Sequence, residues 1–126
     1  MIVNAKVAPS HSLLFIAGAP DDFETPEISR EGLVWSTGSC IAVGTLMEFD
    51  GETLVVLSNE MAEDPADPLL RKVFGGAIDT PKKEVWVSTV DLDGILSLSV
   101  ATVRSNIEIW ANDRNEPDEL LILVRT

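Results

Sequence analysis

The 126-residue sequence has one cysteine, one histidine and no tyrosine, and this scarcity excludes several kinds of site. The single cysteine, Cys40, cannot form an intramolecular disulfide, and free thiols are typical of reducing compartments. One cysteine and one histidine also fall short of the four ligands of an ordinary zinc centre, so we expect no metal. We expect no cofactor, because no glycine-rich phosphate loop with its Lys and Ser/Thr is present.

Long apolar runs are lacking as well. The run Leu13–Ala17 near the N-terminus is too short for a persuasive signal segment. No segment approaches the roughly 18 apolar residues that a membrane-spanning helix needs. Together with the lone cysteine, these features predict a cytoplasmic, soluble protein with no membrane partner.

Positive charge is scarce, because nine Lys and Arg face 21 Asp and Glu, for a formal net charge of −12. Nucleic acids and anionic membranes attract proteins mainly through cations, so neither is expected as a partner. The imbalance is uneven: residues 1–70 hold two cations and 12 carboxylates, whereas residues 71–126 hold seven and nine. Such a field speeds the approach of a basic partner, and it also keeps a protein soluble. Both interpretations remain open.

Nucleophilic catalysis would require the sole histidine, His11, to meet Ser39 or Cys40 in space, and the sequence around them lacks the context of a nucleophile elbow. Asp91–Gly94 begins like a calcium loop, but Thr102 stands where the bidentate glutamate should be. We therefore predict a turn at Asp91–Gly94, a small core residue at Cys40 and no enzymatic activity. A pair of carboxylates of the glycosidase kind stays open, since sequence does not show their separation.

Short apolar runs, punctuated by turn residues, alternate with polar residues at a period of two, which is typical of an all-β protein. For example, Val85 and Val87 alternate with Glu84, Trp86 and Ser88. One buried and one wet face per sheet favours two antiparallel sheets packed face to face. We predict one domain over residues 1–126, an antiparallel β-sandwich of jelly-roll or Greek-key type with eight or nine strands. The stretches expected as strands are 2–8, 12–19, 33–35, 40–49, 53–57, 82–90, 95–101, 107–110 and 119–124.

Two local features are expected between these strands. Asp50-Gly51 predicts a tight hairpin turn within residues 49–57, because positive φ costs least at Gly and Asp. The stretch Asp67–Phe74 predicts the one short helical turn, since Pro68 can occupy its first position and Gly75-Gly76 can end it.

The three tryptophans have two possible roles. Trp86 and Trp110 fall on the polar side of their strands, and Trp35 lies among Val34, Ser36 and Thr37. If these side chains are exposed, they can anchor a partner, as tryptophan often does in binding hot spots. If a loop or the second sheet covers them, they belong to the core.

Acidic residues form three clusters in predicted loops. A sandwich gathers its loops at two ends, so clusters far apart in sequence can converge into one patch. Otherwise they are solvated loop tips. The clusters are Asp21, Asp22, Glu24 and Glu27; Glu60, Glu63, Asp64 and Asp67; and Asp113, Glu116, Asp118 and Glu119.

The order of these parts resembles a group of small bacterial β-sandwich proteins that includes the competence-associated inhibitor of a DNA-entry nuclease. The resembling stretches are SHSLLFIAGA, CIAVGT followed by TLVVLS, and NIEIWANDRNEPDELLILV. The resemblance implies an acidic inhibitor or immunity-type protein that binds a basic nuclease or toxin. It carries no individual functional residue to this sequence.

We therefore predict a non-enzymatic protein-binding module, inhibitor or immunity-like, whose acidic loops dock on a basic protein. A ligand- or carbohydrate-binding sandwich that uses its tryptophans is one alternative, and a subunit of a homo-oligomer is another. Salt should weaken only the charge-driven complex, and light scattering tests the oligomer. The candidate contact residues are Asp21, Asp22, Glu24, Glu63, Asp64 and Asp67, with Trp110 and Glu116 as secondary candidates.

Overall fold

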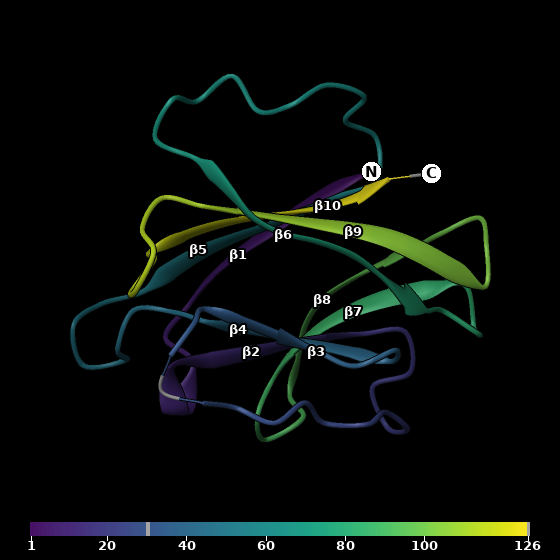
Figure 1. Cartoon of the computed structure of the whole chain (residues 1–126), viewed down its shortest axis with the longest axis horizontal. Helices are drawn as coiled ribbons and strands as arrows, with labels where there is room; N and C mark the ends of the chain where they lie inside the picture. Colours follow the sequence, from purple (N-terminus) through teal and green to yellow (C-terminus); the bar gives the residue numbers. More distant parts are fainter. Residues whose placement is uncertain (30, 126) are drawn as a thin grey trace.

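The computed structural model describes residues 1–29 and 31–125, which form ten strands and one 3₁₀-helix (Figure 1). This all-β composition was predicted, and β6 is a strand that the sequence did not predict. The elements are β1 (Ile2–Val7), η1 (Ser10–Ser12), β2 (Leu13–Ala17), β3 (Val34–Ser36), β4 (Cys40–Gly44), β5 (Thr53–Ser58), β6 (Arg71–Asp79), β7 (Glu84–Thr89), β8 (Gly94–Ser99), β9 (Arg104–Ala111) and β10 (Glu119–Arg125).

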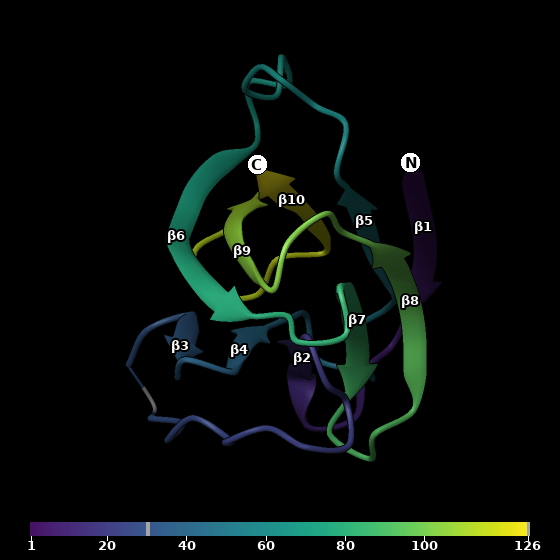
Figure 2. The ribbon, with the colours of Figure 1, turned by 90° about the vertical axis from the view of Figure 1, so that its right-hand side faces the viewer.

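The strands form two five-stranded sheets that face each other as layers (Figures 1 and 2). Sheet A has the order β1-β5-β10-β9-β6, and sheet B has the order β3-β4-β2-β7-β8. Strands β5 and β10 run parallel, with Val55 opposite Leu120, and the other described pairs are antiparallel. The expectation of antiparallel sheets therefore holds for sheet B and is wrong for sheet A, which is mixed, whereas the jelly-roll or Greek-key assignment stays a prediction.

Alternation along each strand decides which side chains fill the space between the sheets. In β9, Ile107 and Ile109 are buried, whereas Glu108 and Trp110 lie on the outer surface of sheet A. Fully burying each large aliphatic side chain contributes roughly 1.5–3 kcal/mol. The main core also includes Val55, Leu57, Ile78, Leu120, Ile122 and Val124 from sheet A and Leu14, Ile16, Ile41, Val43, Val85, Val87 and Leu98 from sheet B.

The outer face of β2 and β4 is apolar too, and it is covered in part by Phe23 and Trp35. Phe15 and Cys40 form a second, smaller cluster there with Ala42, packed against Phe23 and Trp35. The ring centroids of Phe15 and Phe23 are 5.6 Å apart in an edge-to-face arrangement. Cys40 is thus a small core residue, as predicted.

The predicted hairpin at Asp50-Gly51 is wrong, because β4 and β5 belong to different sheets. The turn lies at Met47–Asp50, where the Asp50 N–H donates to the Met47 carbonyl at 2.9 Å, and Gly51 has a φ of 141°. A Gly there is required, since other residues rarely adopt positive φ. Period-two alternation marks strands but does not say which strand pairs with which.

The predicted helical turn over Asp67–Phe74 is also wrong, since Pro68 and Leu69 form a turn and β6 begins at Arg71. A bulge between Lys72 and Phe74 lets both Val73 and Phe74 pack against the core. Pairing with β9 therefore overrides the local preference of the sequence. The predicted turn at Asp91–Gly94 is confirmed in outline, as residues 90–93 connect β7 to β8.

At one edge the two layers come close enough to exclude any side chain. A Cβ atom added to Gly18, which follows β2, would lie 2.2 Å from the Asp79 carbonyl oxygen at the end of β6. The Asp79 N–H also donates to the Gly38 carbonyl at 2.8 Å. Backbone of sheet A is thus joined directly to the connections of sheet B.

Candidate protein-binding surface

His11 and Cys40, which a nucleophilic site would have to bring together, lie at opposite ends of one strand pair. His11 precedes β2 at the end where Leu13 pairs with Gly44, whereas Cys40 pairs with Ala17. Four residue steps along a strand separate these ends by roughly 13 Å. Burial also raises the pKa of the Cys40 thiol to about 12, so it is not a thiolate at neutral pH.

Residues 1–29 and 31–125 contain neither a metal-binding cluster nor a membrane-spanning helix. No group of three or more His, Cys, Asp and Glu side chains is arranged there to hold a metal ion. None of the helical structure in that part of the chain is long and apolar enough to cross a bilayer.

The first acidic cluster lies on the outer side of sheet B. The Glu24 N–H donates to Ser39 Oγ at 2.8 Å, and Thr37 Oγ1 donates to the Glu24 carbonyl at 2.7 Å, which fixes the segment to the connection between β3 and β4. The Asp21 carboxylate lies 3.7 Å from Lys82 Nζ. The Asp22 N–H donates to the Ala19 carbonyl, and its side chain is exposed.

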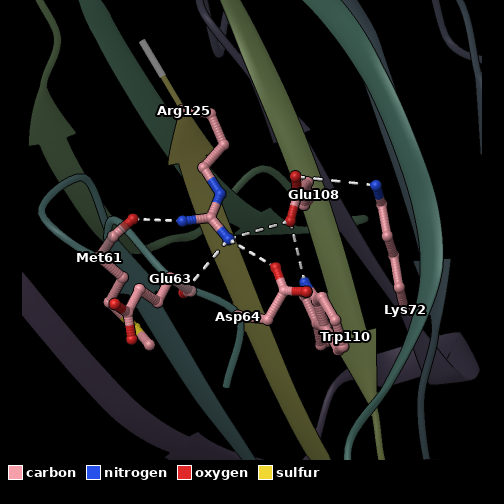
Figure 3. Close-up of polar contacts among 7 residues, drawn as sticks. All are labelled: Met61, Glu63, Asp64, Lys72, Glu108, Trp110 and Arg125. Atoms are coloured by element: carbon pink, nitrogen blue, oxygen red, sulfur yellow. Dashed lines mark hydrogen bonds and ion pairs between the residues drawn. The ribbon is translucent and has the colours of Figure 1, made fainter. Parts of the chain in front are cut away.

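The second cluster belongs to the segment 59–70, which is held over sheet A by Arg125 of β10 (Figure 3). The guanidinium donates to the carbonyl oxygens of Met61 and Glu63 and to Asp64 Oδ1, the last at 3.4 Å. It also lies 3.3 Å from Glu108 Oε1 on β9. Asp64 is therefore partly neutralised and helps to hold the segment in place.

Glu108 connects this arrangement to Trp110 and Lys72. Trp110 Nε1 donates to Glu108 Oε1 at 3.1 Å, and Lys72 Nζ lies 3.7 Å from Glu108 Oε2. Partial burial raises the pKa of Glu108, but the hydrogen bonds from Trp110 and Arg125 and the charges of Arg125 and Lys72 together lower it below its ordinary value. Glu108 thus stays ionised, and the network joins β6, β9 and β10.

The other two candidates in this segment differ in role. The Leu69 N–H donates to Asp67 Oδ1 at 2.9 Å, so the Asp67 side chain shapes the turn before β6. No hydrogen bond or ion pair of the Glu63 side chain is found among the described residues, and only its carbonyl is used.

The tryptophans are neither core residues nor fully exposed. All three are half-buried on the outer faces of the sheets. Each indole N–H has a partner, which is Ser29 Oγ for Trp35, Glu84 Oε2 for Trp86 and Glu108 Oε1 for Trp110. The rings are therefore fixed against their sheets with part of their surface accessible.

The structure does not bring the first two acidic clusters together. Residues 18–29 pass outside sheet B, and the segment 59–70 passes outside sheet A, on the opposite side of the molecule (Figures 1 and 2). It does bring Glu63, Asp64 and Trp110 to one face, around Arg125 and Glu108 (Figure 3). The remaining candidate, Glu116, lies in the connection between β9 and β10.

The connection that contains Glu116 lies beside the one that joins β4 to β5. The Leu46 N–H donates to the Pro117 carbonyl at 2.9 Å, and the Leu54 N–H donates to the Asp118 carbonyl at 2.8 Å. We call residues 47–52 and 113–119 the acidic end. Its seven carboxylates, none of which forms an ion pair with a cation in the described ranges, are Glu48, Asp50, Glu52, Asp113, Glu116, Asp118 and Glu119.

Apolar side chains are exposed at the acidic end. Phe49 is 87% exposed and Met47 is 48% exposed, and Ile28 of the segment 18–33 is also exposed. Met47 and Ile28 line a shallow hollow together with Glu116. An apolar group of this kind, rimmed by charge, is typical of an interaction site.

Side-chain hydrogen bonds hold this end in one conformation. The Glu116 N–H donates to Asp113 Oδ2 at 3.0 Å, and this and neighbouring backbone donors lower the pKa of Asp113 below its ordinary value. Asn112 bonds both the Asp118 side chain and the Glu119 N–H. A surface organised in advance loses less entropy on binding.

Sequence reasoning missed Glu48, Phe49, Asp50 and Glu52, because it assigned them to a strand end and a hairpin turn. The signal that could have identified them is an aromatic residue between carboxylates in a connection, since such a side chain gains nothing from folding if it stays in water. Arg125 was missed as well, and nothing in its sequence neighbours indicates the residues that it contacts.

Comparison with known proteins bears on the fold. No protein-family model matches the sequence, and no curated protein matches it. The structure is similar, with a TM-score of 0.65, to the crystal structure of ComJ from Bacillus subtilis, an inhibitor of the DNA-degrading activity of NucA. The match covers 100% of this chain and 98% of ComJ at 9% sequence identity. The resemblance predicted from the strand patterns is therefore confirmed at the level of the fold.

Proposed function

We propose that this protein is a non-enzymatic, inhibitor-like binding module that docks on a basic protein such as a nuclease or toxin. The observation that carries the proposal is Phe49, a strongly exposed aromatic side chain among carboxylates that have no described ion-pair partner. The shared fold supports it, because ComJ inhibits a nuclease.

The acidic end supplies two separate contributions to such a complex. Its carboxylates, Glu116 among them, would attract a cationic surface and raise the rate of association. Phe49 and Met47 would enter an apolar depression between the partner's cations and slow dissociation. On a nuclease, the carboxylates would occupy the positions of substrate phosphates.

The other candidate residues take supporting roles in this proposal. Asp21, Asp22 and Glu24 contribute to the field of the molecule from the outer side of sheet B. Glu63 and Trp110 extend the contact over sheet A, while Asp64 and Asp67 chiefly hold the segment 59–70 in shape.

Affinity capture from a lysate of the source organism tests the proposal. Three baits are used side by side, namely the wild-type chain, Phe49→Ala and the charge reversal Glu48→Lys, Asp50→Lys and Glu52→Lys. We expect a basic protein that the wild-type bait retains, that salt elutes and that both variants retain less. Its nuclease or toxin activity should fall when the wild-type chain is added. Equal retention by all three baits, or elution insensitive to salt, would rule out the acidic end.

A further inference from the structure

A second surface feature gathers cations beside the acidic end. A hollow of about 660 Å³ opens on the outer side of sheet A, between the start of β6 and the end of β9. Its volume lies within the range that accommodates small organic ligands. We call it the Trp110 hollow, and it is lined by Leu69, Leu70, Arg71, Lys72, Val73, Trp110, Ala111, Asn112, Asp113 and Arg114.

Three of the nine cations of the chain line this one hollow. Arg71 and Arg114 form no ion pair with a carboxylate in residues 1–29 or 31–125, and Lys72 lies 3.7 Å from Glu108. In a protein with a net charge of −12, a gathering of cations does not serve general solubility. It places three cations around one hollow, where they can attract an anion.

The one carboxylate among the lining residues, Asp113, forms no ion pair with these cations. It accepts a hydrogen bond from the Glu116 N–H at 3.0 Å, within its own connection. The two arginine side chains remain available for an external anion, and a guanidinium can hold a carboxylate through two parallel hydrogen bonds.

Trp110 supplies a flat apolar wall. Its N–H is bound to Glu108, which fixes the ring on the outer face of β9, and Leu69, which is 69% exposed, lies at the rim. The bulge between Lys72 and Phe74 sends Val73 and Phe74 to the core while Lys72, paired with Trp110, stays outside. Lys72 and Trp110 are therefore neighbours on the outer face, while Arg71, which pairs with Ala111, and Arg114 line the same hollow.

We propose that the Trp110 hollow binds a small organic anion with a flat apolar body, such as an aromatic carboxylate. Arg71 and Arg114 hold the carboxylate, and the ring lies against Trp110 and Leu69. This goes beyond the docking function, because the ligand is a small anion rather than a basic protein, and the hollow adjoins the acidic end, with which it shares Asp113 and Arg114. Either proposal can fail while the other stands.

Titration of the full chain with 2-naphthoate tests the proposal, with 2-naphthalenemethanol as the neutral analogue. Binding is followed by amide NMR shifts. We expect saturable binding of 2-naphthoate, with the largest shifts at Lys72, Trp110 and Arg114, and binding of the alcohol weaker by about tenfold. Equal affinity for the two compounds, or shifts centred elsewhere, would overturn the proposal.

Matched variants separate a local site from the overall charge. Arg71→Gln with Arg114→Gln removes two exposed cations from the hollow, and Lys82→Gln with Lys83→Gln removes two from the connection between β6 and β7. We expect the arginine pair to weaken 2-naphthoate binding by about tenfold and the lysine pair to leave it unchanged, with both variants folded. Equal weakening by the two pairs would overturn the assignment.

Discussion

Arg125 of β10 and Glu108 of β9 are paired on the outer face of sheet A, with Arg125 Nη2 3.3 Å from Glu108 Oε1, and both side chains are largely shielded, at 19% and 21% exposed. The same guanidinium holds the segment 59–70 through the carbonyls of Met61 and Glu63. One ion pair therefore positions a segment that the sequence alone suggests is free to bind a partner.

Replacing this arginine should release the segment. We expect Arg125→Gln to lower the free energy of unfolding by about 2 kcal/mol, because it removes charged hydrogen bonds and leaves Glu108 with a weaker partner. Chemical denaturation measures the loss, and hydrogen exchange should accelerate in residues 61–65. Arg104→Gln, which breaks an exposed pair with Asp79, is the control and should cost less than about 1 kcal/mol. Equal losses would contradict the tethering role of Arg125.

The lowered pKa of Glu108 predicts a pH dependence. The unfolded pKa of Glu is about 4.3, so the ionised form stabilises the fold above that pH, and the contribution disappears as the pH falls through the lower folded pKa. The stability difference between the wild type and Glu108→Gln should be constant near neutrality and shrink below about pH 4. In an Arg125→Gln background the same difference should vary less with pH. A pH-independent difference in urea unfolding would disprove the linkage.

Cys40 predicts a loss of folding stability at alkaline pH. Its pKa is raised to about 12 by burial, whereas a thiol in the unfolded chain has a pKa of about 8.5. The unfolded state therefore loses a proton that the folded state keeps, and stability should decline as the pH rises above about 8.5. Cys40→Ala should flatten this decline. A thiol reagent should label the native protein only at the rate of unfolding, and rapid labelling would show that the thiol is accessible.

Gly18 should be intolerant of any side chain. A Cβ there would lie 2.2 Å from the Asp79 carbonyl, a backbone atom that cannot move without shifting β6. We expect Gly18→Ala to cost about 2–3 kcal/mol in thermal or chemical unfolding. Gly38→Ala is a matched control, since an added Cβ meets nothing within 4 Å, and its effect should stay within about 1 kcal/mol. Equal effects would mean that the layers adjust at this edge.

Charge and apolar contact at the acidic end should affect different rate constants. Reversal of Glu48, Asp50 and Glu52 to Lys should lower the association rate constant for the basic partner by about tenfold at low salt. Phe49→Ala should instead raise the dissociation rate constant, at a cost of about 2 kcal/mol in binding. Surface plasmon resonance separates the two. Reversal of Asp21, Asp22 and Glu24 to Lys, on the outer side of sheet B, should slow association less. An equal reduction of the association rate constant would indicate that the partner contacts both faces of the molecule.

Particular residues show where sequence reasoning succeeded. Ile107, Ile109 and Glu108 could be assigned to faces because side chains alternate strictly along a strand. Cys40 could be assigned to the core because it begins an apolar strand. The resemblance to a nuclease inhibitor could be stated because the order of strands along the chain can be predicted without knowing how the strands pair.

The failures have a common cause. Asp50-Gly51 has the chemistry of a hairpin turn, yet β4 and β5 enter different sheets, because Leu46 and Leu54 pair with the connection between β9 and β10. Gly75 and Gly76 favour a helix end, yet they pair with Glu108 and Ile107 of β9. In each case hydrogen bonds to a distant segment outweigh a local preference.

The sequence by itself determined that the chain is all-β, that its charge is strongly negative and that its alternating apolar residues face a core, since these follow from residue types and a period of two. Only the tertiary structure decided that residues 18–29 and 59–70 lie on opposite layers, that Met47 lies near Glu116 with Phe49 exposed in the same connection as Met47, and that Arg71 and Arg114 line one hollow with Trp110. The physical reason is that strand pairing determines which connections become neighbours. Backbone N–H and C=O groups are alike in nearly all residues, so the hydrogen bonds between strands cannot be assigned to a particular partner from the sequence.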